Sequence, residues 1–193
     1  MNSTTKGALG YALVTAAVVS PLVAHVTIGP ATIALEETTF AAVAKQLGEA
    51  PIVRAGDAGG GRAQTCYATS GPRPTVYYLE SGEMGGGERI MQVDAVSAGT
   101  ATAAEDSIIA TRCHTLAPGT TAAKTDRGIM LDQSRADVER RLQVVGRDSA
   151  GVTLYSKSEE HGTSASYDIS SWVRVRYIAG RVAAFSAGVV SSR

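Results

Sequence analysis

The stretch SWVRVRYIAGRVAAFSAG, residues 171–188, decides the expected fold. Its first half alternates between apolar and polar side chains, which is the period of a half-buried β-strand. An Ala-Gly pair at 179–180 and a second apolar run follow, so the stretch predicts a β-hairpin with one face toward a core. That core face would carry Val173, Val175 and Tyr177.

A short amphipathic helix is expected before this hairpin, within GIMLDQSRADVERRLQVVG, residues 128–146. Ser134 stands where a helix N-cap belongs and begins a capping-box-like start. Val138 and Leu142 are four residues apart, so they share one helix face that would cover the apolar side of the hairpin. With a further strand at 151–157, the segment indicates an α-β-β-β unit in which residues 158–170 form a long exposed loop.

A weaker copy of this unit precedes it, offset by about 95 residues. It begins TIALEETTFAAVAKQLGEAP, residues 32–51, with Thr38 at the expected N-cap and Val43 and Leu47 on the helix face. Three strand-like runs bounded by turn residues follow, at residues 64–70, 74–81 and 88–96.

We therefore expect an α+β fold of two tandem units, each a short helix and loop packed on a three-stranded antiparallel meander. The units would span residues 32–96 and 128–193. A linker, residues 97–127, would join them around one ordered piece, Ser107–Leu116, which a disulfide would hold against the first sheet.

The overall composition restricts the class of partner. The chain has 193 residues, 44% of them hydrophobic, with 18 Lys+Arg against 18 Asp+Glu. This size is typical of one globular domain or two very small ones. A net charge of zero argues against a nucleic-acid binder, because contacts to phosphates need an excess of Lys and Arg. We expect a protein partner instead.

The N-terminal segment has the character of an export signal. No charged side chain lies between Lys6 and Glu36, and residues 8–24 are almost entirely small or apolar. Residues 1–24 are predicted to be a signal peptide cleaved after Ala24, with an uncleaved membrane anchor over residues 8–28 as the alternative. The protein would then be exported, periplasmic or extracellular, and would contact a membrane only through an uncleaved N-terminal segment.

The two cysteines are expected to form a disulfide. An even number of cysteines in an exported chain is typical of disulfide bonding, and Cys66 with Cys113 allows only one pairing. The alternative is a metal site that combines them with His114 and His161, but the chain has no C-x-x-C or H-x-x-x-H spacing. We expect neither a metal nor another cofactor. The scattered acidic residues, Asp94 among them, are interpreted as a solvated edge.

A helix, a loop and a three-stranded meander, present twice in an exported chain, resemble the SmpA/OmlA (BamE-like) family. In tandem form the arrangement is similar to β-lactamase inhibitory protein. The residues that carry the resemblance are Gly128-Ile129-x-Leu131, Ser134-Arg135-x-x-Val138-x-x-x-Leu142, Tyr155, the hairpin 173–185 and Leu47-Gly48-Glu49-Ala50-Pro51. The resemblance implies a binding module that presents a sheet surface to other proteins.

The candidate binding surface lies on the other side of the hairpin strand. Trp172, Arg174 and Arg176 alternate with the apolar residues, and Trp and Arg are enriched among residues that dominate protein interfaces. Tyr77 and Tyr155 are added as aromatic candidates on the same concave surface. The alternative is that these side chains merely tolerate a solvated sheet face, with a cation–π contact between neighbours.

We therefore expect an exported, non-catalytic protein-binding or envelope-assembly module. A secreted protein inhibitor of another enzyme is the alternative, because binding and inhibition can use the same surface. A small exported enzyme that uses His114 or His161 as its base is the third hypothesis. No G-x-S-x-G motif is present, so an enzyme is not expected.

Overall fold

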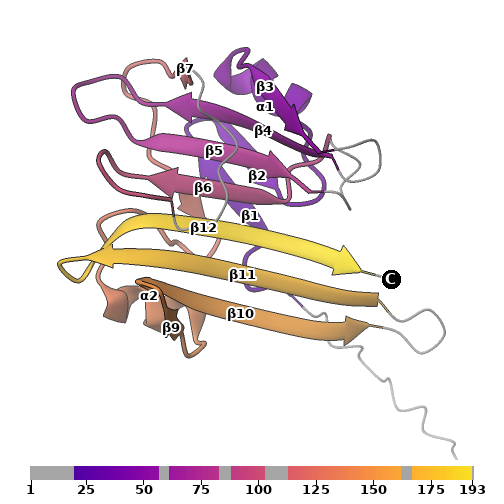
Figure 1. The fold of residues 1–193 in the computed structure, drawn as a ribbon, viewed down its shortest axis with the longest axis vertical. Helices are drawn as coiled ribbons and strands as arrows, with labels where there is room; N and C mark the ends of the chain where they lie inside the picture. The colour runs from indigo at the N-terminus through magenta and orange to yellow at the C-terminus, as the bar shows by residue number, and fades with distance from the viewer. Residues whose placement is uncertain (1–19, 57–60, 83–87, 103–112, 162–166, 193) are drawn as a thin grey trace, which may run out of the picture.

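The computed structural model describes residues 20–56, 61–82, 88–102, 113–161 and 167–192 (Figure 1). Most of the large sheet is a single antiparallel succession in the order β3-β4-β5-β6-β12-β11-β10-β9, and β7 pairs in parallel with β4. These strands are β3 (Ile52–Ala55), β4 (Arg62–Ala68), β5 (Val76–Ser81), β6 (Gln92–Val96), β7 (His114–Thr115), β9 (Arg147–Ser149), β10 (Val152–His161), β11 (Tyr167–Ile178) and β12 (Arg181–Ser192).

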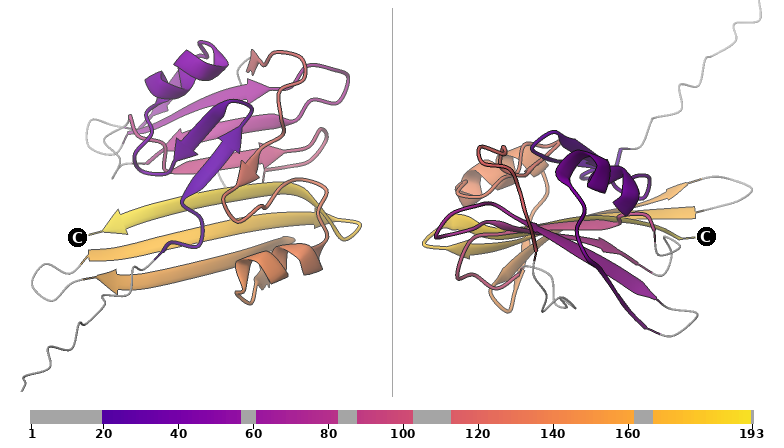
Figure 2. Two further views of the ribbon diagram at one scale, coloured as in Figure 1. Left: turned by 180° about the vertical axis from the view of Figure 1, so that it is seen from behind. Right: turned by 90° about the horizontal axis from the view of Figure 1, so that it is seen from above.

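A second layer covers one face of this sheet. It consists of two short helices and a small sheet in the order β2-β1-β8 (Figure 2). Its elements are α1 (Phe40–Leu47), α2 (Arg135–Leu142), β1 (His25–Ile28), β2 (Ala31–Ala34) and β8 (Lys124–Thr125). The main hydrophobic core lies between the two layers, and it includes Val173 and Val175 of the predicted hairpin. Both helices of the described residues lie on this covered side, and the opposite face of the large sheet is here called the outer face (Figure 2).

The expected α+β class is wrong. The structure is a β-rich fold, with 49% of the described residues in strands and 11% in helices. The difference arises because segments expected to be leader, linker or loop form strands. β1 and β2 lie before the first helix, and β3 and β9 each add an edge strand directly after a helix.

The expected loop at residues 158–170 is wrong at both of its ends, which are strands, while residues 162–166 lie outside the described residues. β10 and β11 continue as one hairpin, with Ser158 opposite Ser170 and His161 opposite Tyr167. Ser and Glu have a weak preference for strands, so the local sequence predicted a loop. β11 and β12 pair with each other along this region, however, and β10 gains backbone hydrogen bonds by following them.

The helices begin at the hydroxyl caps that the pattern indicated, with one shift. The Ser134 hydroxyl oxygen accepts a hydrogen bond from the Asp137 N–H at 3.2 Å. In α1 the N-cap is Thr39, not Thr38, and its hydroxyl oxygen accepts from the Ala42 N–H. Thr38 instead accepts a hydrogen bond from the Ala34 N–H at 2.9 Å.

The two expected units share one sheet, and β6 and β12 pair at its centre. Asp94 lies opposite Ser186 in this pair. From the centre, each half continues outward through the same succession of neighbours: β5, β4 and β3 on one side, and β11, β10 and β9 on the other. Each half also has a residue with a left-handed backbone shortly before its helix. Glu36 lies three residues before the N-cap Thr39, Asp132 lies two residues before the N-cap Ser134, and both have φ of +66°.

Residues 20–24 form part of this fold. Leu22 and Val23 are buried in the core, and the Leu22 N–H donates to the Ser171 hydroxyl at 2.7 Å. The Ala24 carbonyl accepts from the Leu35 N–H at 3.0 Å. The expected cleavage point after Ala24 therefore lies within a packed segment, whereas residues 1–19 of the expected leader lie outside the described residues. No helix in the described ranges is long and apolar enough to cross a membrane.

Beginning the chain at His25 instead of Ser20 is expected to lower the free energy of unfolding by about 3 kcal/mol, because two buried apolar side chains are lost. Urea denaturation of the two truncated forms measures the difference. Equal stability would show that residues 20–24 do not contribute to the core.

Candidate functional site on the outer face of the sheet

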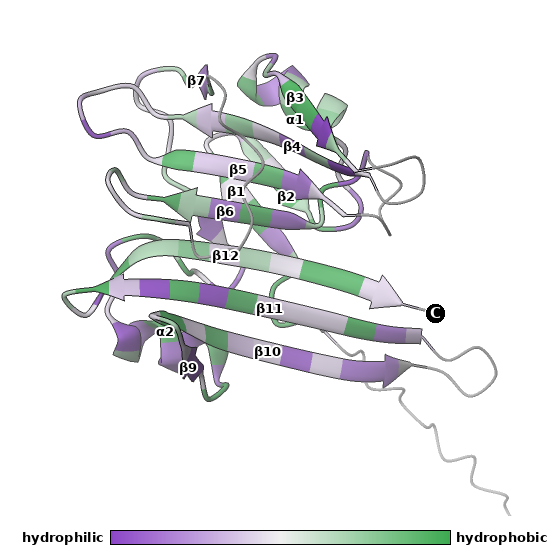
Figure 3. Cartoon of the chain, in the orientation of Figure 1, coloured by the Kyte–Doolittle hydropathy of each residue, from purple (hydrophilic) through white to green (hydrophobic). Residues whose placement is uncertain are grey.

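The alternation of β11 places Trp172, Arg174 and Arg176 on the outer face. Val173 and Val175 between them are fully buried on the helix-covered face. All three outer-face side chains are half-buried, and Figure 3 shows how polar and apolar residues alternate along β11. The outer face thus holds the three residues around which the sequence predicted a binding surface.

Trp172 packs against a glycine on the neighbouring strand. Trp172 pairs with Gly188, and the indole ring occupies the space that a Cβ atom at Gly188 would fill. The guanidinium carbon of Arg174 lies 5.8 Å from the centre of the Trp172 ring, within the range of a cation–π contact. The indole Nε1 is buried and has no hydrogen-bond partner among the described residues.

Arg176 connects the outer face to the chain that follows β6. One of its terminal nitrogens donates to the Thr102 carbonyl at 3.3 Å. Ser97, at the end of β6, donates through its backbone N–H and its hydroxyl to the Ala183 carbonyl. The chain therefore lies against β12 and β11 as far as Thr102.

Asp94 is buried at the centre of the outer face, which corrects its interpretation as part of a solvated edge. Only 1% of its surface is exposed, and burial raises the pKa of its carboxyl group to about 7. The Glu80 carboxylate adds to this rise, whereas Arg174 and the Gln92 amide oppose it, since each favours the charged form. The Gln92 side-chain amide donates to Asp94 Oδ1 at 3.2 Å.

The predicted disulfide is confirmed, and it lies on the outer face. Cys66 of β4 is bonded to Cys113, immediately before β7. The Leu116 N–H donates to the Ala68 carbonyl, so this end of the expected ordered piece is held against β4, while residues 107–112 lie outside the described residues. Because the two sulfurs are bonded to each other, they cannot serve as the thiolate ligands of the alternative metal site. Within the described ranges, no group of three or more His, Cys, Asp or Glu could hold a metal ion.

Tyr77 and Tyr155 do not belong to the binding surface, contrary to the expectation from the sequence. Both are fully buried on the helix-covered face, where Tyr77 pairs with Tyr67 and Tyr155 pairs with Val173. The sequence around Tyr77 carries a Tyr on either face, so local alternation could not decide between them. Tyr78, the neighbour of Tyr77, is the one on the outer face, opposite Asp94.

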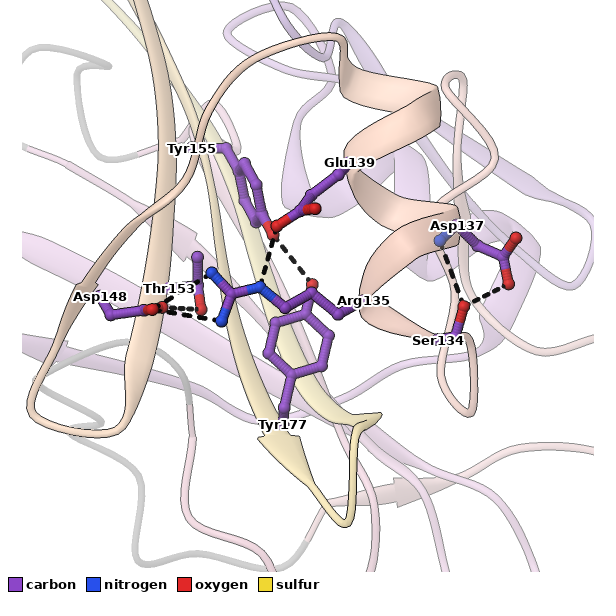
Figure 4. Close-up of polar contacts among 8 residues, drawn as sticks. All are labelled: Ser134, Arg135, Asp137, Glu139, Asp148, Thr153, Tyr155 and Tyr177. Atoms are coloured by element: carbon purple, nitrogen blue, oxygen red, sulfur yellow. Dashed lines mark hydrogen bonds and ion pairs between the residues drawn. The ribbon is translucent and has the colours of Figure 1, made fainter.

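A polar cluster below α2 holds the helix to the sheet (Figure 4). The Arg135 guanidinium donates to Glu139 at 2.9 Å and to Asp148 of β9 at 3.2 Å, and lies 5.7 Å from the centre of the Tyr177 ring. The Thr153 hydroxyl and Arg135 lower the pKa of the Asp148 carboxyl group. The contacts of this cluster attach α2 to the sheet, which favours a structural role for its residues over a catalytic one.

His114, one of the two candidate bases, packs between two elements. Its ring lies edge-on to the Tyr67 ring at 5.8 Å, and it occupies the space that a Cβ atom at Gly48 would fill. The Tyr67 hydroxyl donates to the Gly48 carbonyl at 3.1 Å, which closes this contact. The side chain of His161, the other candidate, lies outside the described residues.

Gly188, Asp94 and Ser186 were not among the predicted site residues. A glycine inside an apolar strand is a signal that another group approaches the backbone closely, and it could have indicated the place of Trp172. The buried Asp94 gave no comparable signal. The resemblance to the SmpA/OmlA family stays a prediction, since no family model, curated protein or solved structure matches this chain.

Proposed function

We propose that this protein is an exported, non-catalytic protein-binding module whose contact surface is centred on Trp172 and Arg174. The observation that carries the proposal is the position of Trp172: its half-buried side chain lies on the outer face, packed on Gly188 and flanked by Arg174. A large aromatic side chain held in one position loses little conformational entropy when a partner covers it.

The compartment supports the same proposal. The Cys66–Cys113 disulfide is typical of an oxidising, exported environment. In the periplasm or outside the cell, such a module would act in envelope assembly or by binding another exported protein. The resemblance to the SmpA/OmlA family, in which a sheet surface is presented to other proteins, points in the same direction.

Trp172→Ala is expected to weaken binding to the partner about thirtyfold, which corresponds to about 2 kcal/mol for truncation of an interface anchor. The partner is first captured from an exported or envelope fraction with the wild-type protein, and the affinity is then measured by calorimetry. Val145→Ala is the matched control, because this exposed side chain lies in the loop after α2, away from the outer face.

Equal affinities for the wild-type protein, Trp172→Ala and Val145→Ala would contradict the proposed surface. The activity of the captured protein also distinguishes an inhibitor from an envelope-assembly module. Loss of a captured enzyme's activity on binding would support an inhibitor, and an assembly partner without affected activity would support an envelope module.

A further inference from the structure

The outer edge of β10 has no backbone partner over its second half. β10 pairs with β11 from Thr153 to His161. On its other side, β9 covers only Val152 to Leu154. Among the strands in the described part of the chain, no other strand pairs with this edge, and Figure 1 shows β10 running far beyond β9.

The turn between β9 and β10 determines which backbone groups point outward. Ala150 and Gly151 have φ of +48° and +77°, as in a type I′ hairpin whose flanking residues, Ser149 and Val152, exchange backbone hydrogen bonds. Every second residue of an antiparallel strand directs its N–H and C=O to the same side. The residues of β10 that face the open edge are therefore Ser156, Ser158 and Glu160.

Two further contacts agree with this assignment. The Lys157 carbonyl accepts from the Ser171 hydroxyl at 3.4 Å, so Lys157 is directed toward β11. In the other half of the sheet, β4 occupies the place that β10 has in this half, and its outer edge is covered by both β3 and β7. The second half of β10 therefore lacks the cover that the corresponding edge of β4 has.

The charges along this edge would match those of a second copy of the same strand in antiparallel orientation. The edge reads Ser156-Lys157-Ser158-Glu159-Glu160 and is predominantly hydrophilic in Figure 3. Lys157 and Glu159 share the helix-covered side, where their charged groups lie 2.7 Å apart and both remain partly exposed. A strand with these residues carries opposite charges at equal distances from Ser158.

We propose that the open edge of β10 pairs with β10 of a second copy of this chain, antiparallel, about a two-fold axis at Ser158. In this register, Lys157 faces the partner's Glu159 and Glu159 faces the partner's Lys157. Ser158 exchanges backbone hydrogen bonds with the partner's Ser158, and Ser156 does so with the partner's Glu160. The two large sheets become one continuous sheet.

Neighbouring registers are excluded by charge. An axis at Lys157 would place two lysines opposite each other, and an axis at Glu159 or Glu160 would oppose two glutamates. Like charges directly opposite destabilise a strand pair, whereas opposite charges stabilise it. Charged residues on an edge usually discourage unwanted strand pairing, and here they would admit only the one partner strand whose charges match.

Charge exchange provides the decisive experiment. The association of the 193-residue wild-type protein is measured by sedimentation equilibrium up to high micromolar concentration, because an interface of one strand pair is small and reversible. Lys157→Glu and Glu159→Lys are each expected to weaken self-association about tenfold, since two attractive pairs become repulsive in each homodimer.

A mixture of the two single variants is the critical sample. In a heterodimer, the two glutamates of Lys157→Glu face the two lysines of Glu159→Lys, so the mixture is expected to associate at least as tightly as the wild-type protein. Repair of a contact within one chain cannot produce this result. Ser158→Pro, which removes a backbone donor from the edge, is expected to be monomeric at concentrations where the wild-type protein is half dimeric.

Circular dichroism and thermal unfolding confirm that each variant is folded. If Ser158→Pro does not fold, the charge variants alone decide the question. A wild-type protein that is monomeric at every concentration would overturn the proposal, and so would a mixture that associates no better than the single variants. Trp172→Ala is expected to leave the dimer intact, which separates this edge from the proposed binding surface.

Discussion

Asp94→Asn is expected to raise the free energy of unfolding by about 3–4 kcal/mol at pH 8. The folded protein holds the Asp94 carboxyl group at a pKa of about 7, compared with 3.8 for an ordinary aspartate. Each unit of difference corresponds to about 1.4 kcal/mol. Asparagine has nearly the shape of the protonated acid and is never charged, so it avoids the cost of burying a carboxylate.

The pH dependence of this effect has a definite sign. Between pH 4 and pH 7 the folded state keeps the Asp94 proton, whereas the unfolded chain releases it. The contribution of Asp94 to stability is therefore fully present below about pH 4 and is lost as the pH rises through about 7. The difference between Asp94→Asn and the wild-type protein should be near zero at pH 4 and largest at pH 8, as measured by urea denaturation.

Asp148→Asn is the matched control because its shift has the opposite sign. The Thr153 hydroxyl and Arg135 favour the charged form of Asp148 and lower its pKa. Its replacement should destabilise the protein at neutral pH and have less effect in acid. A loss of stability at pH 8 in Asp94→Asn would show that the Asp94 carboxylate is stabilised by its neighbours, and that the outer face is not a low-dielectric environment.

The Cys66→Ser/Cys113→Ser double variant is expected to lose about 4 kcal/mol of stability. The disulfide joins residues 47 apart, so it removes a large amount of chain entropy from the unfolded state. It is also the covalent attachment between β4 and the chain that begins β7. The measurement is denaturation of the oxidised wild-type protein and the double variant under the same conditions.

Reduction gives an internal control for this prediction. A thiol reagent should lower the stability of the wild-type protein to the level of the double variant and leave the double variant unchanged. Titration of the denatured, unreduced wild-type protein should detect no free thiol. Two free thiols in protein recovered from an exported fraction would contradict both the bond and the oxidising compartment.

Local patterns were sufficient for the elements that depend on neighbours in the chain. The alternation of residues 171–178 identified a strand and placed Val173 and Val175 in the core. The Ser134 cap identified the start of α2. The pairing of the cysteines followed from their number and the expected compartment. The alternation of side chains and the helix caps can be recognised in a short stretch of sequence, and the cysteines need only be counted.

Other features depended on contacts between distant parts of the chain. The outer position of Tyr78 and the buried position of Tyr77 follow from pairing with β4 and β6, because either residue could occupy either face of an isolated strand. The strand at His25–Ile28 resembled the end of a leader, since an apolar run in a core strand and one in a leader have the same composition.

The sequence by itself determined the hairpin, the start of α2 and the disulfide, and it placed Trp172, Arg174 and Arg176 opposite the core. Only the tertiary structure decided the β-rich class, the burial of Asp94 and the open edge of β10. The physical reason is that strand pairing and the burial of a polar side chain depend on which strands become neighbours. That choice is made by hydrogen bonds and packing between residues as far apart as Asp94 and Ser186.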